Sequence, residues 1–423
     1  MKIIYLLFTF CYLLNTNAQT VTTFAGSTVG FNDGAATIAK FNYPRGLAVA
    51  TDGTVYVADT GNNCIRKISV EGVVSTLAGN GIKGFADGLG TSAQFSSPWG
   101  LAVAADGTVY VTEIYDNRIR KITADGLVTT LSESTFGFTD GLVSIAQFNQ
   151  PADLSIDADG TLFIADTYNN SIRKITTDNM VTTLVGGTMG FGNGIGTSAR
   201  FHYPQGISVA SDGTIFVVDT GNHSIRKISV EGMVTTLAGQ WFPGSADGPG
   251  ASALFKSPSD LTVANDGTVF VADHANHRIR RITVDGYVST LIGNSEGFAD
   301  GQGIEVKFND PQGIAVSSDG ALFISDTYNH RIRKITGNLA TANFQLENQV
   351  SVYPNPTSSL INLELDAVIA IKITIFDMNG RALQSKNILD NKNTIDISNL
   401  ANGIYLMQIT TSKGTIYKKI VKK

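Results

Sequence analysis

Residues 46–79 read GLAVATDGTVYVADTGNNCIRKISVEGVVSTLAG and contain four short β segments separated by turns. The pair Asp52-Gly53 divides the first two segments, and Asp-Gly between alternating apolar residues is a strong hairpin signal because Gly adopts positive φ readily. A polar turn follows Asp59, and Glu71-Gly72 precedes the last segment. The stretch therefore predicts four antiparallel strands, one blade of a β-propeller, with a type I′ turn at Asp52-Gly53.

The last phrase of this stretch recurs along the chain at intervals of 53 or 54 residues. So even a period indicates a repeat architecture, which has to be recognised before any local assignment. The copies are VTTFAG from Val21, VSTLAG from Val74, VTTLSE from Val128, VTTLVG from Val181, VTTLAG from Val234 and VSTLIG from Val288. Six copies predict an all-β fold with a six-bladed propeller.

The two ends of the repeat region predict how the ring closes. The region starts with a lone fourth-strand phrase at Val21, and its sixth copy stops after a third strand at Thr336. Unpaired strand edges are prone to aggregation, so pairing of residues 21–26 with residues 331–336 is expected.

The phrases ADTGNNCIRKIS from Ala58 and SDTYNHRIRKIT from Ser325 resemble the NHL repeat family, and the resemblance covers roughly residues 20–337. It implies a six-bladed propeller used mainly as a binding platform, with a few enzymatic branches. The connection between the fourth strand and the next first strand, GFADGLGTSAQFSSP from Gly84, is longer than in most family members.

Residues 1–18 are typical of a secretory signal peptide: Lys2 is followed by an apolar stretch and by a small-residue cleavage site ending at Ala18. After its removal Cys64 is the only cysteine, so no internal disulfide is expected. No further segment is apolar enough to predict a transmembrane span.

The C-terminal part is interpreted as a separate domain. Residues 19–337 are assigned to the propeller, residues 338–349 to a polar linker, and residues 350–423 to a small immunoglobulin-like β-sandwich with a turn at Asn379-Gly380. The motifs VYPNP from Val352, IKITIFDMNGRAL from Ile371, DISNLANGIYLMQI from Asp396 and YKKIVKK from Tyr417 resemble the type IX secretion C-terminal sorting domain. This resemblance implies export machinery as a partner and a location outside the outer membrane, either secreted or attached to the cell surface.

The charge distribution argues against nucleic acid as a partner. Residues 19–349 contain 21 Lys or Arg against 31 Asp or Glu, whereas residues 350–423 contain nine against five. Phosphate binding needs a clustered positive field, which an acidic propeller does not provide.

Several rows of residues recur with the period of the blades and receive a structural interpretation. The Arg row in the third strands is expected to form ion pairs with the acids that end the second strands, and a Phe row is expected to wedge between blades. His223, His277 and His330 occupy one turn position that holds Asn in the other copies, and the Asp-Gly pairs of the long connections suit turns. None of these acids forms the alternating loop of a dedicated calcium site, so we expect no cofactor, with calcium as the weaker alternative.

Function is sought where the six copies differ. The residue after the proline of each first strand lies beside the predicted channel and varies, and the position after it is Asp rather than Gly in two copies. Tyrosines occupy three of the turns between second and third strands, and a Trp-Phe-Pro insertion is unique to one connection. The candidate ligand-binding residues are Arg45, Trp99, Asp153, Gln205, Asp260, Gln312, Tyr115, Tyr168, Tyr328 and Trp241.

Two hypotheses follow from these residues. The first is a non-enzymatic binding module for an unknown peptide, glycan or small molecule, with no catalytic residues. The alternative is a lactonase-like hydrolase or lyase with a metal at the channel, which would need several ligands converging on the axis. The strand starts offer only Asp153, Asp260, Gln205 and Gln312 as metal ligands, which are few for a catalytic metal site.

Overall fold

The structure is a computed structural model that describes residues 19–132, 135–337, 350–365, 370–377, 381–387, 392–411 and 414–423. The predicted signal peptide 1–18, the linker 338–349 and the turn at Asn379-Gly380 lie outside these residues. The chain divides into two compact units, with the boundary between Gly337 and Asn338. No helix of the described residues is long and apolar enough to cross a membrane.

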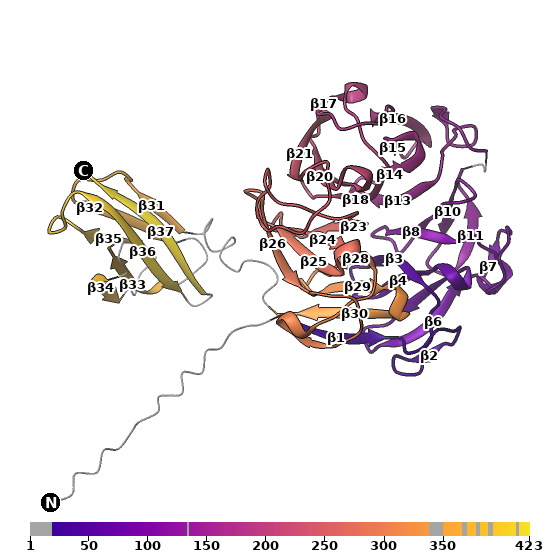
Figure 1. Ribbon diagram of the computed structural model, residues 1–423, viewed down its shortest axis with the longest axis horizontal. Helices are drawn as coiled ribbons and strands as arrows, with labels where there is room; N and C mark the ends of the chain where they lie inside the picture. Colours follow the sequence, from indigo (N-terminus) through magenta and orange to yellow (C-terminus); the bar gives the residue numbers. More distant parts are fainter. Residues whose placement is uncertain are drawn as a thin grey trace, which may run out of the picture. The chain divides into compact units, whose positions relative to one another are not determined.

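The first unit consists of six antiparallel sheets arranged around an axis, which confirms the six-bladed propeller (Figure 1). We number the blades 1–6 by their innermost strands. These are β3 (Pro44–Val49), β8 (Pro98–Val103), β13 (Pro151–Ile156), β18 (Pro204–Val209), β23 (Asp260–Val263) and β28 (Pro311–Val316). Each lies beside the innermost strands of the two neighbouring blades, and β28 lies beside β3.

The next two strands of each blade carry the apolar alternation of the repeat. The second strands are β4 (Val55–Asp59), β9 (Val109–Glu113), β14 (Leu162–Asp166), β19 (Ile215–Asp219), β24 (Val269–Asp273) and β29 (Leu322–Asp326). The third strands are β5 (Cys64–Ile68), β10 (Arg118–Ile122), β15 (Ser171–Ile175), β20 (Ser224–Ile228), β25 (Arg278–Ile282) and β30 (Arg331–Thr336). Short 3-10 helices join second to third strands in five blades: η1 (Thr60–Asn62), η3 (Thr167–Asn169), η5 (Thr220–Asn222), η6 (His274–Asn276) and η8 (Thr327–Asn329).

Each blade has five strands, one more than the sequence predicts. The fourth strands are β6 (Val73–Ala78), β11 (Leu127–Thr130), β16 (Met180–Gly186), β21 (Met233–Gly239), β26 (Tyr287–Ile292) and β1 (Thr20–Ala25). The extra, outermost strands are β2 (Gly34–Ala35), β7 (Gly88–Leu89), β12 (Gly141–Leu142), β17 (Gly194–Ile195), β22 (Gly248–Pro249) and β27 (Gly301–Gln302). They come from the long connections, which also contain η2 (Gly90–Ser92), η4 (Gly196–Ser198) and η7 (Gly303–Glu305). The additional length of these connections thus lines the outer edge of every blade.

The predicted ring closure is confirmed. Strand β1 pairs antiparallel with β30, with Thr20 opposite Thr336 and Val21 opposite Ile335. Blade 6 therefore combines the first strand of the described chain with the last three strands of the propeller.

The prediction of a type I′ turn at Asp52-Gly53 is wrong. Only Gly53 has positive φ, at 86°, and its amide donates to the carbonyl of Ala50 at 2.9 Å. The loop has three residues, a type I turn followed by a left-handed Gly. The Asp52 carboxylate accepts a hydrogen bond from the Thr54 amide at 2.9 Å, which stabilises this longer loop.

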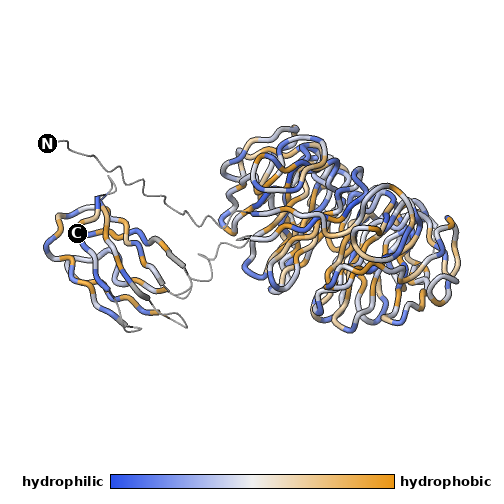
Figure 2. Tube along the Cα trace, turned by 90° about the horizontal axis from the view of Figure 1, so that it is seen from below, coloured by the Kyte–Doolittle hydropathy of each residue, from blue (hydrophilic) through white to orange (hydrophobic). Residues whose placement is uncertain are grey.

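Apolar side chains pack between adjacent blades, as the Phe row predicts. Phe95 is fully buried in a cluster that contains Ile65 of blade 1 and Val109 of blade 2. Figure 2 shows the hydrophobic and hydrophilic segments alternating along the chain in the sheets. The buried row is Phe41, Phe95, Phe148, Phe201, Phe255 and Phe308.

The second unit is a sandwich of two sheets, as predicted. One sheet has the order β31-β32-β35 and the other β34-β33-β36-β37, and Ile361, Met407 and Ile416 belong to the core between them. The strands are β31 (Val350–Tyr353), β32 (Leu360–Leu365), β33 (Ala370–Phe376), β34 (Ala382–Asn387), β35 (Lys392–Asp396), β36 (Gly403–Thr411) and β37 (Gly414–Lys422).

Candidate functional site

The mouth of the central channel is built by the first residues of the innermost strands. Each strand begins at or near a proline, so the following side chains face the axis from all six blades. They line one pocket, which brings together six of the candidates predicted from the sequence. These are Arg45, Trp99, Asp153, Gln205, Asp260 and Gln312, with Ala152, Ser259 and four glycines completing the wall.

Arg45 and Trp99 stack on each other in this mouth. The Arg45 guanidinium lies 3.6 Å from the centroid of the Trp99 ring, and its Nη1 donates to Oε1 of Gln312. Burial lowers the pKa of Arg45 to about 10, so the side chain remains charged at neutral pH. Its Nε is buried without a hydrogen-bond partner. The space left in the pocket is about 20 Å³, enough for one water molecule.

Two carboxyl groups lie beneath this stack. Asp153 Oδ2 accepts a hydrogen bond from the Ile207 amide of blade 4 at 3.1 Å, and Asp260 Oδ2 accepts one from the Ile314 amide of blade 6 at 2.9 Å. Besides burial, the charge of Asp260 and a hydrogen bond between the two carboxyls raise the pKa of Asp153. Burial raises the pKa of Asp260 to about 7, and burial together with the neighbouring carboxyl raises that of Asp153 well above its usual value.

Below the carboxyls the channel widens to a cavity of about 280 Å³. Its polar side chains come from three consecutive blades: Asp153 and Ser155 of blade 3, Ser208 of blade 4, and Asp260, Thr262 and Asn265 of blade 5. At the level of the hydroxyls, blades 1, 2 and 6 present Ala48, Ala102 and Ala315. One half of the wall is therefore polar and the other half is built from small apolar residues.

The three predicted tyrosines surround the mouth, each in contact with an aromatic partner. The rings of Tyr115 and Trp99 are 6.1 Å apart and perpendicular, and those of Tyr328 and Tyr43 are 5.2 Å apart. Tyr168 makes the third pair, with Tyr203 at 4.9 Å. All of these tyrosines are exposed, Tyr115 to 57%.

The sequence analysis missed two of these aromatic residues, Tyr43 and Tyr203. Both lie directly before the proline of an innermost strand and have φ of 50° and 51°. The signal was available, because the other copies carry Ser97, Gln150, Ser257 and Asp310 at this position.

Trp241 does not belong to the channel mouth. Its side chain is 68% exposed, its ring lies 5.7 Å from that of Phe242, and it is not among the residues that line the pocket. The structure therefore places Trp241 outside the pocket that six of the other candidates line.

A polar chain beside the mouth was also missed. His274 Nε2 lies 2.8 Å from Asp310 Oδ1, and Nδ1 lies 3.1 Å from the Ser257 carbonyl. Both ring nitrogens of His274 thus face oxygen atoms. Asp310 Oδ2 in turn accepts from Gln312, the partner of Arg45. The signal was His274 itself, which replaces the Thr found in four other copies.

The other histidines have the structural role expected from their turn position. His223, His277 and His330 adopt left-handed backbone conformations, and their Nδ1 atoms accept hydrogen bonds from the amide before the proline of the next blade. Asn63, Asn117 and Asn170 make the same contact through Oδ1. Within the described residues, no group of three His, Cys, Asp or Glu lies close enough together to hold a metal ion.

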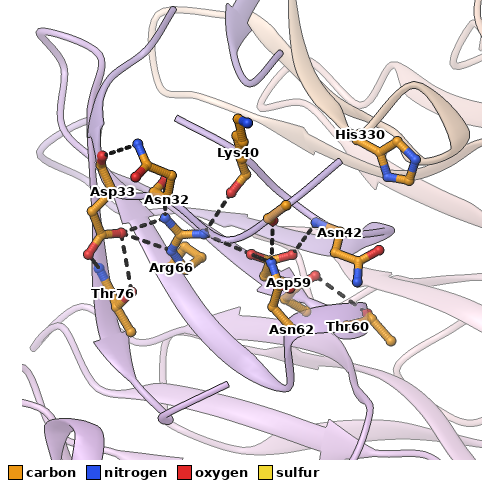
Figure 3. Close-up of polar contacts among 12 residues, drawn as sticks. Asn32, Asp33, Lys40, Asn42, Asp59, Thr60, Asn62, Arg66, Thr76 and His330 are labelled. Atoms are coloured by element: carbon orange, nitrogen blue, oxygen red, sulfur yellow. Dashed lines mark hydrogen bonds and ion pairs between the residues drawn. The ribbon is translucent and has the colours of Figure 1, made fainter. Parts of the chain in front are cut away.

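The Arg row forms the expected ion pairs and also binds acids that had been assigned only to turns. In blade 1, Arg66 donates to the buried Asp59 at 2.8 Å and to Asp33 of the long connection (Figure 3). Asp33 also accepts from the Thr76 amide at 3.1 Å. Arg66 thus joins the second strand, the third strand and the connection of one blade.

Comparison with known proteins agrees with these two units. The secretion system C-terminal sorting domain matches residues 351–423, and the NHL repeat matches residues 41–68, 148–175, 201–228, 255–282 and 308–335. The chain carries five NHL repeats and a sorting domain. The sorting domain assigns the protein to the type IX secretion system and to export across the outer membrane, to the cell surface or the extracellular space. Blade 2, residues 95–122, lies outside the matched ranges of the NHL propeller.

Curated relatives match part of this chain in sequence, and solved structures share the propeller fold. Protein SUPPRESSOR OF QUENCHING 1, chloroplastic, from Arabidopsis thaliana is 33% identical over 60% of this chain, but the match spans only 26% of that protein. A Bacteroides thetaiotaomicron protein of unknown function superposes with a TM-score of 0.61 and 23% identity, covering 75% of this chain and 76% of the other. An auxiliary nutrient binding protein from the same organism superposes with a TM-score of 0.59 and 19% sequence identity, again covering 75% of this chain and 76% of the other. At these identities the two structures establish the fold alone.

Proposed function

We propose that the exported NHL propeller is a binding module whose ligand lies across the channel mouth and the tyrosines around it. The observation that carries this proposal is the stack of Arg45 on Trp99 at the mouth, with the exposed Tyr115 against Trp99 and two further pairs of exposed tyrosines on the same face. Trp, Tyr and Arg dominate the binding energy of most characterised interfaces, and Tyr contributes contact area at a low entropic cost.

The position of these residues in the repeat supports the proposal. Trp99 and Tyr115 both belong to blade 2, which departs most from the family pattern. A face needed only for ring packing would keep the repeating residues of the other blades. The presence of Trp99 and Tyr115 in the blade that diverges from the repeat favours recognition of a peptide, a glycan or a small molecule.

The two tryptophans of the chain provide a direct test. A Trp241→Phe variant leaves Trp99 as the only tryptophan, so its fluorescence reports events at the mouth. The protein is titrated with the members of a glycan array and of a peptide library. We expect a hit to change Trp99 emission, and Trp99→Ala and Arg45→Ala to weaken binding at least tenfold.

Tyr287→Ala is the matched control, because Tyr287 is an exposed tyrosine on β26 that does not line the mouth. If Trp99→Ala and Arg45→Ala bind like the unmodified protein while Tyr287→Ala does not, the site is assigned to the wrong place. Elemental analysis of the purified protein distinguishes the rival hydrolase or lyase, which would carry a stoichiometric metal.

A further inference from the structure

Asp153 and Asp260 divide the central channel into two compartments. Both side chains line the small pocket at the mouth and also the larger cavity below it. The two carboxyl groups are therefore the partition between the loop face and the opposite end of the channel.

The backbone at this level leaves no room for other side chains. Gly46, Gly100, Gly206 and Gly313 occupy the equivalent position in the other four blades. A Cβ on any of them would come within 2.1 to 2.5 Å of an atom of the next blade. At Gly100 the nearest atom is Oδ1 of Asp153 itself, at 2.4 Å. The inner ring is thus tight, and the carboxyl groups fill its remaining space.

The partition depends on a proton. A hydrogen bond between two carboxyl groups requires that one of them is protonated, because a carboxylate can only accept. Each carboxyl also accepts a backbone amide of the next blade, so the pair connects blades 3 and 5 to blades 4 and 6.

No other acid faces the pair. In the described part of the chain, the residues that line the two compartments include one further charged side chain, Arg45 on the mouth side. The other polar side chains that line the cavity are the neutral Ser155, Ser208, Thr262 and Asn265. Beyond Arg45, Asp310 acts on the guanidinium and lies 2.8 Å from His274.

We propose that the proton shared by Asp153 and Asp260 is a latch that closes the central channel, and that its loss opens the partition and loosens the contacts of blades 3 to 6. Two carboxylates at hydrogen-bonding distance in a buried site repel each other, so complete ionisation separates them. This inference concerns regulation of the channel and does not depend on the proposed ligand.

The direction of the pH effect follows from the raised pKa values. A carboxyl whose pKa is higher in the folded protein stabilises the fold fully below its unfolded value of about 4. That contribution is lost as the pH rises through the folded value, about 7 for Asp260. The latch is therefore expected to close in mildly acidic solution and to open in mildly alkaline solution.

The test is the thermal unfolding temperature of the full chain between pH 5 and pH 9. Asp153→Asn and Asp260→Asn keep an amide-accepting oxygen but cannot ionise, and Asp260→Gly copies the residue of four other blades. We expect the unmodified protein to lose several degrees over this range and the variants to lose much less. The control Asp106→Asn alters a hairpin acid whose pKa is lowered mainly by the Thr108 amide, so its profile should match the unmodified protein.

Two further measurements separate a latch from a simple packing role. The infrared band of protonated carboxylic acids should decrease between pH 6 and pH 9, and the decrease should be smaller in Asp260→Gly, in which only the other buried acids with raised pKa values, such as Asp59 and Asp166, contribute. Amide hydrogen exchange at Ile207 and Ile314, corrected for the intrinsic rate, should accelerate over the same range only in the unmodified protein. A pH profile shared by the protein and all three variants would overturn the proposal, as would amides whose protection does not change. Neither result would affect the binding test at Trp99.

Discussion

At the scale of single residues, the propeller repeats one charged cluster six times. Each third strand buries an Arg completely, and each second strand ends in an acid that is also fully buried. Breaking such a pair from one side leaves an uncompensated buried charge, which usually costs about 3–5 kcal/mol. The stability of each blade therefore depends on the contacts that its buried Arg forms with the second strand and with the long connection.

Blade 4 is the exception and allows a prediction. Asn193 replaces the connection Asp of the other blades, and its Oδ1 accepts from Arg226 at 2.9 Å and from the Thr236 hydroxyl at 3.1 Å. A carboxylate there could also accept the Thr236 amide, as Asp140 does for Thr183 in blade 3 at 3.0 Å. Because the position is exposed, we expect Asn193→Asp to stabilise the propeller by only about 0.5–1 kcal/mol.

Urea unfolding at pH 7 measures this gain, and Asp140→Asn in blade 3 should lose a similar amount. The gain should disappear in acidic solution, where a carboxyl at this position becomes protonated. Asp247 illustrates this: burial opposes ionisation, but hydrogen bonds from Thr290 and Arg280 outweigh it and lower the pKa. An Asn193→Asp protein that is less stable at pH 7 would contradict this account of the cluster.

The sequence predicts the partners of Arg66 only in part. The period of the repeat indicates that Arg66 pairs with Asp59 on the neighbouring second strand, because an Arg and an acid recur at these two positions in every copy. It does not reveal Asp33, since an Asp-Gly pair in a long connection is already explained by turn geometry. The same limit applies to the channel: variation at Arg45 and Trp99 is visible in the sequence, but only the structure shows that these side chains stack and that Asp153 and Asp260 line both the pocket and the cavity.

At the scale of elements, β1 is the strand on which the ring depends. Val21 and Ala25 are fully buried, and the Thr23 amide and hydroxyl both donate to Asp300, which binds Arg333. Without β1, the edge of β30 would be exposed and the cluster of blade 6 would lose a partner.

Removal of residues 19–26 should therefore abolish cooperative unfolding of the propeller and cause association through the open edge. Size-exclusion chromatography and thermal unfolding measure both effects. A synthetic peptide of residues 19–27, added in excess, should restore the transition, whereas the same peptide with Val21→Asp should not. A truncated protein that unfolds at the temperature of the full chain would show that closure lies elsewhere.

The repeat predicts four of the five strands in each blade, and the reason for the fifth is physical. A strand such as Gly34-Ala35 has two residues, too short for an apolar alternation to be visible. The strand pairs with β6 because the ion pair between Asp33 and Arg66 fixes the long connection against the blade. Elements positioned by a side chain of another strand cannot be inferred from their own sequence.

At the scale of the whole molecule, the chain combines two units with separate cores and opposite charge. The core of the sandwich contains residues from Val350 to Ile420 only, and the propeller clusters contain residues of adjacent blades only. Domains with their own cores generally fold as independent units.

Deletion of residues 350–423 should accordingly leave the unfolding temperature of the propeller unchanged within about 1 °C. In a domain this large, a shift of about 1 °C corresponds to only a fraction of a kcal/mol in the free energy of unfolding. The same deletion should stop export, because the sorting domain is the part that the type IX machinery recognises. Fractionation of cells that express the truncated propeller should find it folded but inside the outer membrane. A carrier protein fused to residues 350–423 should be found outside the outer membrane. The carrier alone is the matched control and should stay inside. If the truncated propeller were exported as well, recognition would have to involve the NHL blades, and the separation of folding from sorting would fail.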